Sequence, residues 1–221
     1  MNKFKLIIII CMLLSILSIT KAYALVNSYT LLGKTIYIDP GHGGRDSGTT
    51  YKDIYEKDIN LIMSKKIEQY LVSKGATVYL TRESDIDLST TTINKKRSDL
   101  TNRAKLINKS NANMYISIHL NYISNSKWQG LQMFYNNKNK ENEKIANNLT
   151  SYLKEVSSNI REPKKENIYY MYKQIKVPGV LIELGFLSNS NDRYRLTREE
   201  YQNKLAENIA NSIERYFQEK D

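Results

Sequence analysis

The stretch KTIYIDPGHGG, residues 34–44, joins an apolar run to a glycine-rich turn and contains one of the two histidines of the chain. Residues 34–39 have the β-branched and aromatic content of a buried strand, which Pro40 and Gly41 then end. His42 follows directly, between glycines. In parallel sheets the loops at strand ends carry the functional groups. The stretch therefore predicts a strand of an α/β fold with a functional side chain at its end.

Similar strands alternate with segments of helical periodicity along the rest of the chain. Further strands are predicted over 76–81, 114–120, 130–135, 168–172 and 180–184, and helices over 57–74, 94–109, 141–157 and 199–217. This alternation is typical of helices packed on both faces of a parallel sheet. We predict a single-domain three-layer α/β/α sandwich on a largely parallel, twisted sheet.

The first 24 residues have the features of a secretory signal peptide. A basic start precedes an apolar run over 6–20, and 22–24 (Ala-Tyr-Ala) match the small-x-small pattern of a cleavage site. The run is shorter than the about 20 residues that span a membrane. An uncleaved anchor is the alternative. We expect a signal peptide over 1–24, a functional domain over 25–221, and no membrane span after cleavage.

Charge and cysteine content narrow the class of protein. The only cysteine, Cys11, lies in the predicted signal, so the exported domain is expected to be stable without disulfides. A net charge of +10 suits polyanionic surroundings such as a bacterial wall, although a generally solvated basic surface is the alternative. Nucleic acid is not an expected partner, because exported chains seldom meet it and no binding motif is present.

Four polar side chains stand at element ends that a parallel sheet brings together. His42, His119 and Glu183 each follow or end an apolar strand, and Glu56 opens the first long helix. Two imidazoles and a carboxylate are a common ligand set for catalytic Zn²⁺. A further carboxylate then carries the proton. His42, Glu56 and His119 fit the first role, and Glu183 fits the second.

Each of these residues also has a structural interpretation. A single histidine at a strand end is more often a hydrogen-bonded structural residue. Glu56 could serve only as a carboxylate favoured by the dipole of its helix. Glu183 could pair with a buried cation, although a charge buried only for structure is costly. The metal site explains all four positions together, whereas the structural interpretation needs four separate reasons.

Whole motifs then carry a resemblance to a known family. They occur in the order IYIDPGHGGRDSG (36–48), YEKDINL (55–61), RSDLTNRA (97–104), YISIHLN (115–121) and VPGVLIELGFLSN (177–189). Over about residues 34–218 the chain resembles the zinc-dependent N-acetylmuramoyl-L-alanine amidases of the amidase-3 type. The resemblance implies a peptidoglycan hydrolase that cleaves the amide between the lactyl group of N-acetylmuramic acid and L-alanine of the stem peptide.

The resemblance also implies roles for individual residues. One Zn²⁺ per chain is expected on His42, Glu56 and His119, with Glu183 as the catalytic carboxylate. Substrate contacts are expected at Asn121, Gly43 and Gly44, with a turn requirement as the alternative for the glycines and a strand-end cap as the alternative for Asn121.

A short form without wall-binding repeats or an inserted blocking helix resembles the spore-cortex, germination-specific subgroup, with minimal prophage and autolytic amidases as the alternative. Enzymes of that subgroup remove stem peptides so that muramic-δ-lactam can form. We expect secretion across the cytoplasmic membrane of a bacterium, to the cell wall or the spore intermembrane space. Because no targeting module is found, localisation or activation is expected to depend either on charge or on a localising or activating protein partner.

Two other functions remain open from the residues alone. The same ligand set would support a zinc peptidase that cuts within the stem peptide. A catalytically silent wall-binding module could also keep this fold. The products released from peptidoglycan would distinguish an amidase from both.

Overall fold

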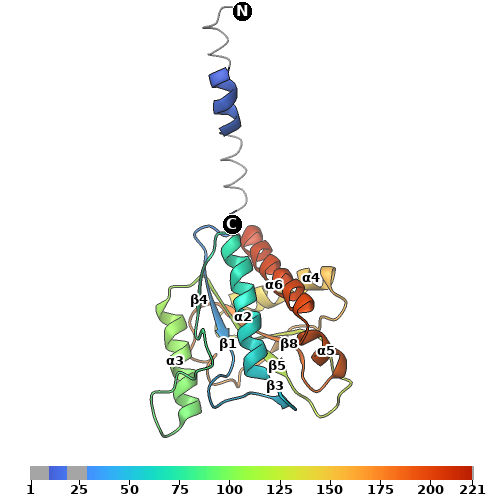
Figure 1. Ribbon diagram of the computed structural model, residues 1–221. Helices are drawn as coiled ribbons and strands as arrows, with labels where there is room; N and C mark the ends of the chain where they lie inside the picture. Colours follow the sequence, from blue (N-terminus) through green and yellow to red (C-terminus); the bar gives the residue numbers. More distant parts are fainter. Residues whose placement is uncertain (1–9, 19–28, 221) are drawn as a thin grey trace, which may run out of the picture.

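The computed structural model describes residues 10–18 and 29–220 (Figure 1). Residues 10–18 are helical, and none of the described helices is long and apolar enough to cross a membrane. The rest of the predicted signal over 1–24, including its Ala-Tyr-Ala pattern, lies outside the described residues. The signal and the domain boundary at residue 25 therefore stay predictions.

A six-stranded sheet forms the centre of the fold, in the order β4-β1-β5-β8-β6-β7. Its strands are β1 (Thr35–Pro40), β4 (Thr77–Leu80), β5 (Met114–Asn121), β6 (Gln132–Tyr135), β7 (Lys164–Lys165) and β8 (Gly179–Phe186). Neighbours among β4, β1, β5 and β8 pair in parallel, whereas β6 runs antiparallel to β8 and parallel to β7. The carboxyl ends of β1, β5 and β8 therefore meet at one edge of the sheet.

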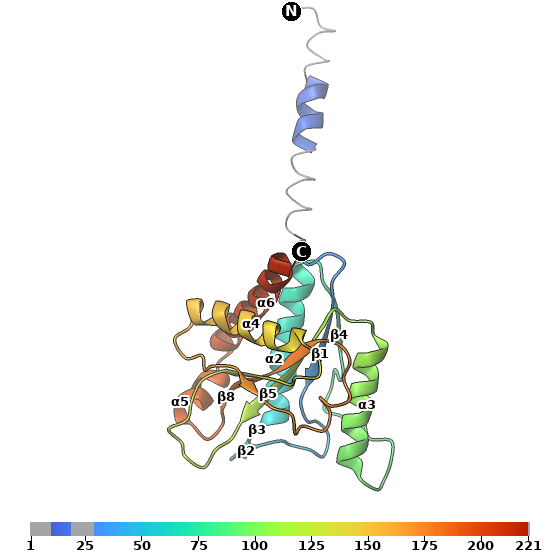
Figure 2. The same cartoon turned by 180° about the vertical axis from the view of Figure 1, so that it is seen from behind.

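Helices cover both faces of this sheet (Figures 1 and 2). One face is covered by α2 (Glu56–Ser73), α4 (Glu141–Val156) and α6 (Glu199–Lys220), and the other by α3 (Lys95–Lys109). A hairpin of β2 (Thr50–Tyr51) and β3 (Ile54–Tyr55) precedes α2, and the short α5 (Ser190–Leu196) follows β8. The predicted three-layer α/β/α fold on a largely parallel sheet is confirmed.

The strands are buried on both faces because their alternate side chains enter two separate cores. In β5, Met114, Ile116 and Ile118 join the large core under α2, α4 and α6. Tyr115 joins the smaller core under α3. This assignment follows from the two-residue period of a strand. It also puts Ser117 and His119 on the α3 face, at the end of the strand.

Most predicted elements are present, with ends that differ by at most three residues. The strand predicted over 168–172 is wrong. Residues 168 and 169 have no regular structure, and 170–174 form a turn in which the backbone N–H of Gln174 donates to the carbonyl of Met171. Its tyrosines favour a strand by composition, but strand propensity yields to packing context. Here Met171, Tyr172 and Ile175 pack against the sheet together. The small elements β2, β3, β7 and α5 were not predicted.

Candidate active site

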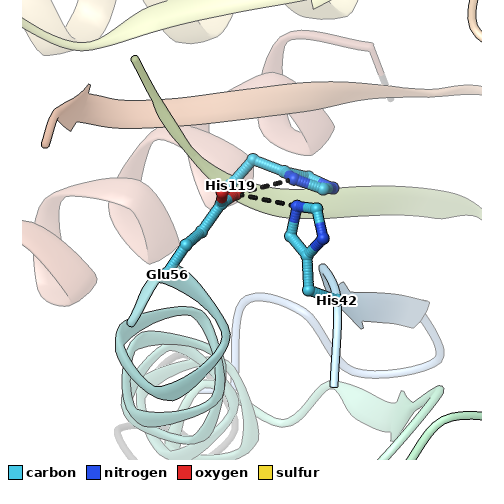
Figure 3. A group of neighbouring side chains, drawn as sticks. All are labelled: His42, Glu56 and His119. Atoms are coloured by element: carbon cyan, nitrogen blue, oxygen red, sulfur yellow. Dashed lines mark hydrogen bonds and ion pairs between the residues drawn. The ribbon is translucent and has the colours of Figure 1, made fainter. Parts of the chain in front are cut away.

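Three of the predicted site residues converge at the carboxyl edge of the sheet (Figure 3). His42 comes from the loop after β1, His119 from β5, and Glu56 from the first turn of α2. Glu56 Oε1 lies 3.1 Å from His42 Nε2 and 3.0 Å from His119 Nδ1. Residues separated by up to 77 positions in sequence thus present their polar atoms to one point.

Backbone geometry at two glycines allows this convergence. A Cβ atom at Gly41 would lie 2.3 Å from the His119 ring, and one at Gly48 would lie 2.5 Å from Glu56 Oε2. Both distances are far below van der Waals contact. His42 itself has a φ of 62°, a left-handed conformation that is uncommon for residues other than glycine. The loop is therefore folded tightly around the three side chains.

Glu56 is fixed in place by backbone donors. The N–H of Thr49 donates to Oε2 at 2.8 Å, and the N–H of Leu120 donates to Oε1 at 3.0 Å. Burial would raise the pKa of Glu56, but hydrogen bonds and charges from His119 and His42 lower it well below its ordinary value. Glu56 is therefore an ionised, oriented carboxylate at the start of α2, where the helix dipole also favours negative charge.

The three donor groups fit a divalent metal ion such as zinc. Their ligand atoms lie within 4.8 Å of one another. Donor atoms bound to one tetrahedral Zn²⁺ at about 2.0–2.1 Å lie roughly 3.3 Å apart, close to the two distances from Glu56. Two imidazole nitrogens and a carboxylate oxygen can lie this close together only when protons or a cation stand between them. The donor set, two nitrogens and one oxygen, is one that zinc prefers in catalytic sites.

Asp46 forms an ion pair with His42 on the side of the ring away from Glu56. Its Oδ2 lies 3.0 Å from His42 Nδ1, which leaves Nε2 to face Glu56. Burial alone would lower the pKa of His42, but the hydrogen bonds and charges of Asp46 and Glu56 raise it to about 9 in the metal-free chain. A carboxylate behind a histidine ligand fixes its tautomer and raises its basicity, a common arrangement around protein-bound metals.

Glu183 lies beside this cluster in a different environment. It pairs in register with His119 across β5 and β8 and is only 7% exposed. Among the described residues, its buried Oε2 has no hydrogen-bond partner. Burial raises its pKa to about 8, and the nearby charge of Glu56 adds to this effect while His42 opposes it. Glu56 and Glu183 thus differ in protonation near neutral pH, and Glu183 is suited to exchange a proton.

A buried ion-pair network supports the site from below. Asp39, at the end of β1, accepts hydrogen bonds from Thr81 (2.6 Å), Ser117 (2.7 Å) and Arg103 (2.8 Å). Burial would raise the pKa of Asp39, but the charge of Arg103 and these hydrogen bonds lower it. Arg103 also binds Asp99 at 2.8 Å. The network joins β1, β5 and α3 directly beneath the loop that carries His42.

A cavity of about 480 Å³ opens over the cluster. Its lining includes the four predicted chemical residues together with Asn121, so the structure places Asn121 beside them. Gly43 and Gly44 instead face the segment after β4. A Cβ at Gly43 would lie 2.3 Å from the carbonyl of Ile86, and one at Gly44 would lie 2.8 Å from the N–H of Asp87. Substrate contact by these three residues stays a prediction.

Several residues of the cavity wall were not predicted from the sequence. Residues 169–172 line the cavity, together with Lys96 and Leu100 of α3. The hydroxyl of Tyr170 accepts a hydrogen bond from Arg97 Nε at 3.0 Å and lies 3.2 Å from Thr101 Oγ1. The run of tyrosines was visible in the sequence, but its reading as a strand hid its place at the cavity.

Several known proteins are similar to this chain in sequence and in fold. The profile of the family described as N-acetylmuramoyl-L-alanine amidase matches residues 36–215. The germination-specific N-acetylmuramoyl-L-alanine amidase of Bacillus subtilis is 43% identical over 198 residues, which cover 87% of this chain and 84% of that protein. A probable cell wall amidase, LytH, of Staphylococcus aureus is 33% identical over 191 residues, which cover 85% of this chain and 60% of that protein.

Solved structures agree with the sequence comparisons. The CwlD amidase of Clostridioides difficile, in complex with the GerS lipoprotein, superposes with a TM-score of 0.79 at 40% identity. That match covers 84% of this chain and 99% of the other. The catalytic domain of CwlV, an N-acetylmuramoyl-L-alanine amidase of Bacillus (Paenibacillus) polymyxa, has a TM-score of 0.73 at 30% identity, covering 84% of this chain and 98% of the other.

Proposed function

This chain belongs to the N-acetylmuramoyl-L-alanine amidase family, and we propose that it performs the family reaction with one Zn²⁺ held by His42, Glu56 and His119. The reaction is hydrolysis of the peptidoglycan amide between the lactyl group of N-acetylmuramic acid and L-alanine. The observation that carries the zinc proposal is the approach of His42 Nε2 and His119 Nδ1 to the same oxygen of Glu56.

The proposed mechanism divides the work between the metal ligands and Glu183. When bound, zinc supplies a Lewis acid and lowers the pKa of a bound water from about 15.7 to about 7. Glu183 Oε2 accepts a proton from the attacking water and donates it to the amide nitrogen as the C–N bond breaks. The products are the free lactyl carboxylate and the free amine of L-alanine. The buried Oε2 of Glu183 supports this role, because among the described residues it has no hydrogen-bond partner, and burial raises the pKa of the carboxyl group toward neutral pH in the metal-free chain.

Product analysis tests the reaction. The purified protein is incubated with peptidoglycan, with and without a chelator, and the released material is analysed by mass spectrometry. An amidase gives new N-terminal alanine and free lactyl groups, and the chelator abolishes both. Cuts within the stem peptide would indicate a zinc peptidase instead. Absence of any product with both zinc and extract from sporulating cells added would indicate a catalytically silent wall-binding module.

Metal analysis tests the ligands separately from turnover. We expect about one zinc per chain in the wild-type protein and a large loss in a His119→Ala variant. Arg215→Ala serves as a control, because Arg215 binds Glu155 and Glu219 on the exposed surface far from the ligands in sequence. Equal zinc content in the wild type and the His119→Ala variant would remove His119 from the ligand set.

We further propose a role in the spore cortex, where removal of stem peptides permits muramic-δ-lactam formation. The 43% identity to a germination-specific amidase supports this role. The test is expression of this chain in a Bacillus subtilis strain that lacks that relative, followed by muropeptide analysis of the spores. Muramic-δ-lactam should return with the wild type and not with Glu183→Gln. No lactam with a well-expressed, wall-active wild type would contradict the cortex role.

A protein partner and export complete the proposal. A 40% identical amidase structure contains a lipoprotein partner, which supports a partner for this chain as well. The partner is required if the purified chain hydrolyses peptidoglycan only when extract from sporulating cells is added.

Export to the wall or spore intermembrane space is tested by sequencing the amino terminus of the secreted protein. Cleavage of the predicted signal gives a first residue of Leu25.

A further inference from the structure

Two buried arginines lie beneath the loop that carries His42. Arg82, just after β4, is 2% exposed, and Arg103, in α3, is 1% exposed. Burying a cation is costly unless it is paired or fully hydrogen-bonded. The two arginines meet this requirement differently, and the difference indicates separate roles.

Arg103 is neutralised by carboxylates. It lies 2.8 Å from both Asp39 and Asp99. Its remaining donors bind the carbonyl of Pro40 at 2.8 Å and the carbonyl of His42 at 2.6 Å. Removal of Arg103 would leave two buried carboxylates unpaired, so a substitution there tests stability as well as any role in the site.

Arg82 binds only backbone carbonyls. Within the described part of the chain, no carboxylate lies within the 4.0 Å of an ion pair with its guanidinium. Nε donates to Pro40 at 3.0 Å, and Nη1 donates to Ser84 at 3.1 Å. Nη2 donates to Gly41 at 3.0 Å and to Lys57 at 2.8 Å. Burial, with a smaller effect from the charge of Arg103, lowers its pKa to about 10.

The two carbonyl groups that accept hydrogen bonds from Arg82 Nη2 belong to residues next to proposed metal ligands. Gly41 directly precedes His42, and Lys57 directly follows Glu56. One nitrogen atom therefore connects the residue next to one proposed metal ligand with the residue next to another. The two connected segments lie 16 residues apart in sequence, on the β1 loop and on the first turn of α2.

The surrounding chain is shaped to admit Arg82. A Cβ atom at Gly43 would lie 2.9 Å from both Cδ and Nε of Arg82, so a side chain there would displace the arginine. The neighbouring His42 has a φ of 62°, a conformation that persists only when its surroundings enforce it. Hydrogen bonds from Arg82 and Arg103 to three successive carbonyls, those of residues 40–42, provide that enforcement.

We propose that Arg82 is a positioning residue that holds the His42 loop against the start of α2 and thereby sets the separation of His42 and Glu56. This inference rests on the proposed function, because it requires these residues to bind zinc. The planar guanidinium presents several donors in a rigid fork, which a lysine ammonium does not reproduce. Metal affinity should therefore depend on the fork and not only on its charge.

The experiment measures zinc affinity of the purified chain by competition with a chromophoric chelator. Arg82→Lys keeps the charge, and Arg82→Met keeps much of the apolar stem. Both variants should bind zinc roughly 10- to 100-fold more weakly than the wild type, the usual effect of removing support behind metal ligands. Activity titrated with zinc should show a half-saturating concentration that is raised by a similar factor.

Arg193→Met is the matched control. Arg193 also donates to a backbone carbonyl, that of Leu187 at 2.8 Å, and stacks 3.5 Å from the Tyr51 ring centre. Within the described residues, its side chain bonds to Leu187 and stacks on Tyr51, neither of which is adjacent to a proposed ligand, so its loss should change zinc affinity less than twofold even where thermal stability falls. If the role of Arg82 were merely structural, its variants would behave like this control: their melting temperature would fall while their zinc affinity stayed at the wild-type value.

The outcomes separate this inference from the proposed function. A wild-type affinity equal to that of His119→Ala would contradict the zinc site itself. Tight zinc binding by the wild type, with unchanged affinity in folded Arg82→Lys and Arg82→Met, would overturn only the role of Arg82. Wild-type affinity in Arg82→Lys alone would also overturn it, because charge and not the donor fork would then be sufficient.

Discussion

The two faces of the parallel sheet are built from the same strands but differ toward the carboxyl ends. On the face under α2, α4 and α6, the even-numbered positions of β5 are apolar and buried to the end of the strand. On the face under α3, the odd-numbered positions change from Tyr115 to Ser117 and His119. In β8 the same face changes from Leu181 to Glu183. One face thus remains a hydrophobic core, and the other carries the candidate active site.

This difference separates stability from chemistry within a single sheet. Apolar burial on the first face contributes to folding and carries no reactive group. The second face buries polar groups that include Asp39 and Glu183, and a buried carboxyl group lowers stability unless it is paired. Mutations on the two faces should therefore have distinct effects, which the following measurements compare.

The largest effect is expected at the end of β8. Glu183→Gln keeps the size of the side chain but removes its ability to accept a proton. The rate of peptidoglycan hydrolysis should fall about 10²- to 10⁴-fold, while zinc content stays at the wild-type level. Turnover is measured by release of N-terminal alanine. A variant that keeps a tenth of the wild-type rate would exclude Glu183 as the proton carrier.

A large loss of stability is expected from Asp39→Asn on the same face. The change leaves Arg103 without one of its two buried charge partners. Breaking a buried ion pair in this way lowers the free energy of unfolding by about 3–5 kcal/mol. Urea unfolding measures the change. The double variant Asp39→Asn with Arg103→Met should lose less than the sum of the single changes, and strict additivity would show that the pair is not coupled.

Substitution on the hydrophobic face should affect stability without affecting chemistry. Ile209 of α6 is fully buried in the large core. Ile209→Ala should lower the free energy of unfolding by about 2–5 kcal/mol, through lost burial and a residual cavity. Turnover per folded molecule should change less than twofold, measured well below the melting temperature. A selective loss of turnover would show that the two faces are coupled.

A smaller effect separates what Glu183 costs in stability from what it contributes to catalysis. In the metal-free protein its pKa is raised from 4.5 to about 8, so the folded state takes up a proton that the unfolded state releases. This cost is absent below pH 4.5, grows between pH 4.5 and about 8, and is constant above. Glu183→Gln avoids it and should therefore stabilise the chelator-treated protein more at pH 8 than at pH 4.5. Melting curves at pH 4.5 and pH 8 test this, and an equal difference at both would contradict the raised pKa.

The same comparison explains how much of the molecule was predictable. Strand ends and helix periods carry local signals, so the α/β/α fold and the proximity of His42, Glu56, His119 and Glu183 followed from the sequence. Arg82 carried no such signal, because an arginine after a strand ordinarily reads as a solvated surface charge. Three of its four partners lie 25 to 42 positions away in the chain, and all four are backbone carbonyls, which no residue pattern reveals.

The conformation of residues 169–172 was missed for a related physical reason. The tyrosines among them have high strand propensity, but Tyr170 bonds to α3 while Met171 and Tyr172 pack on the sheet. That arrangement depends on the position of α3, which is far away in sequence. The sequence therefore shows the tyrosines of this part of the cavity wall, but their local composition predicts the wrong backbone conformation.

The carboxylate of Asp39 has a further consequence for strand alignment. Asp39 lies opposite Ser117 in the pairing of β1 with β5 and accepts its hydroxyl. A slip of β5 by one residue would bring Ile116 or Ile118 to this place and would turn His119 toward the large core, because strand side chains alternate between faces. The carboxylate would then lose a donor in a dry environment. Asp39 thus selects the one alignment in which His119 and His42 face each other.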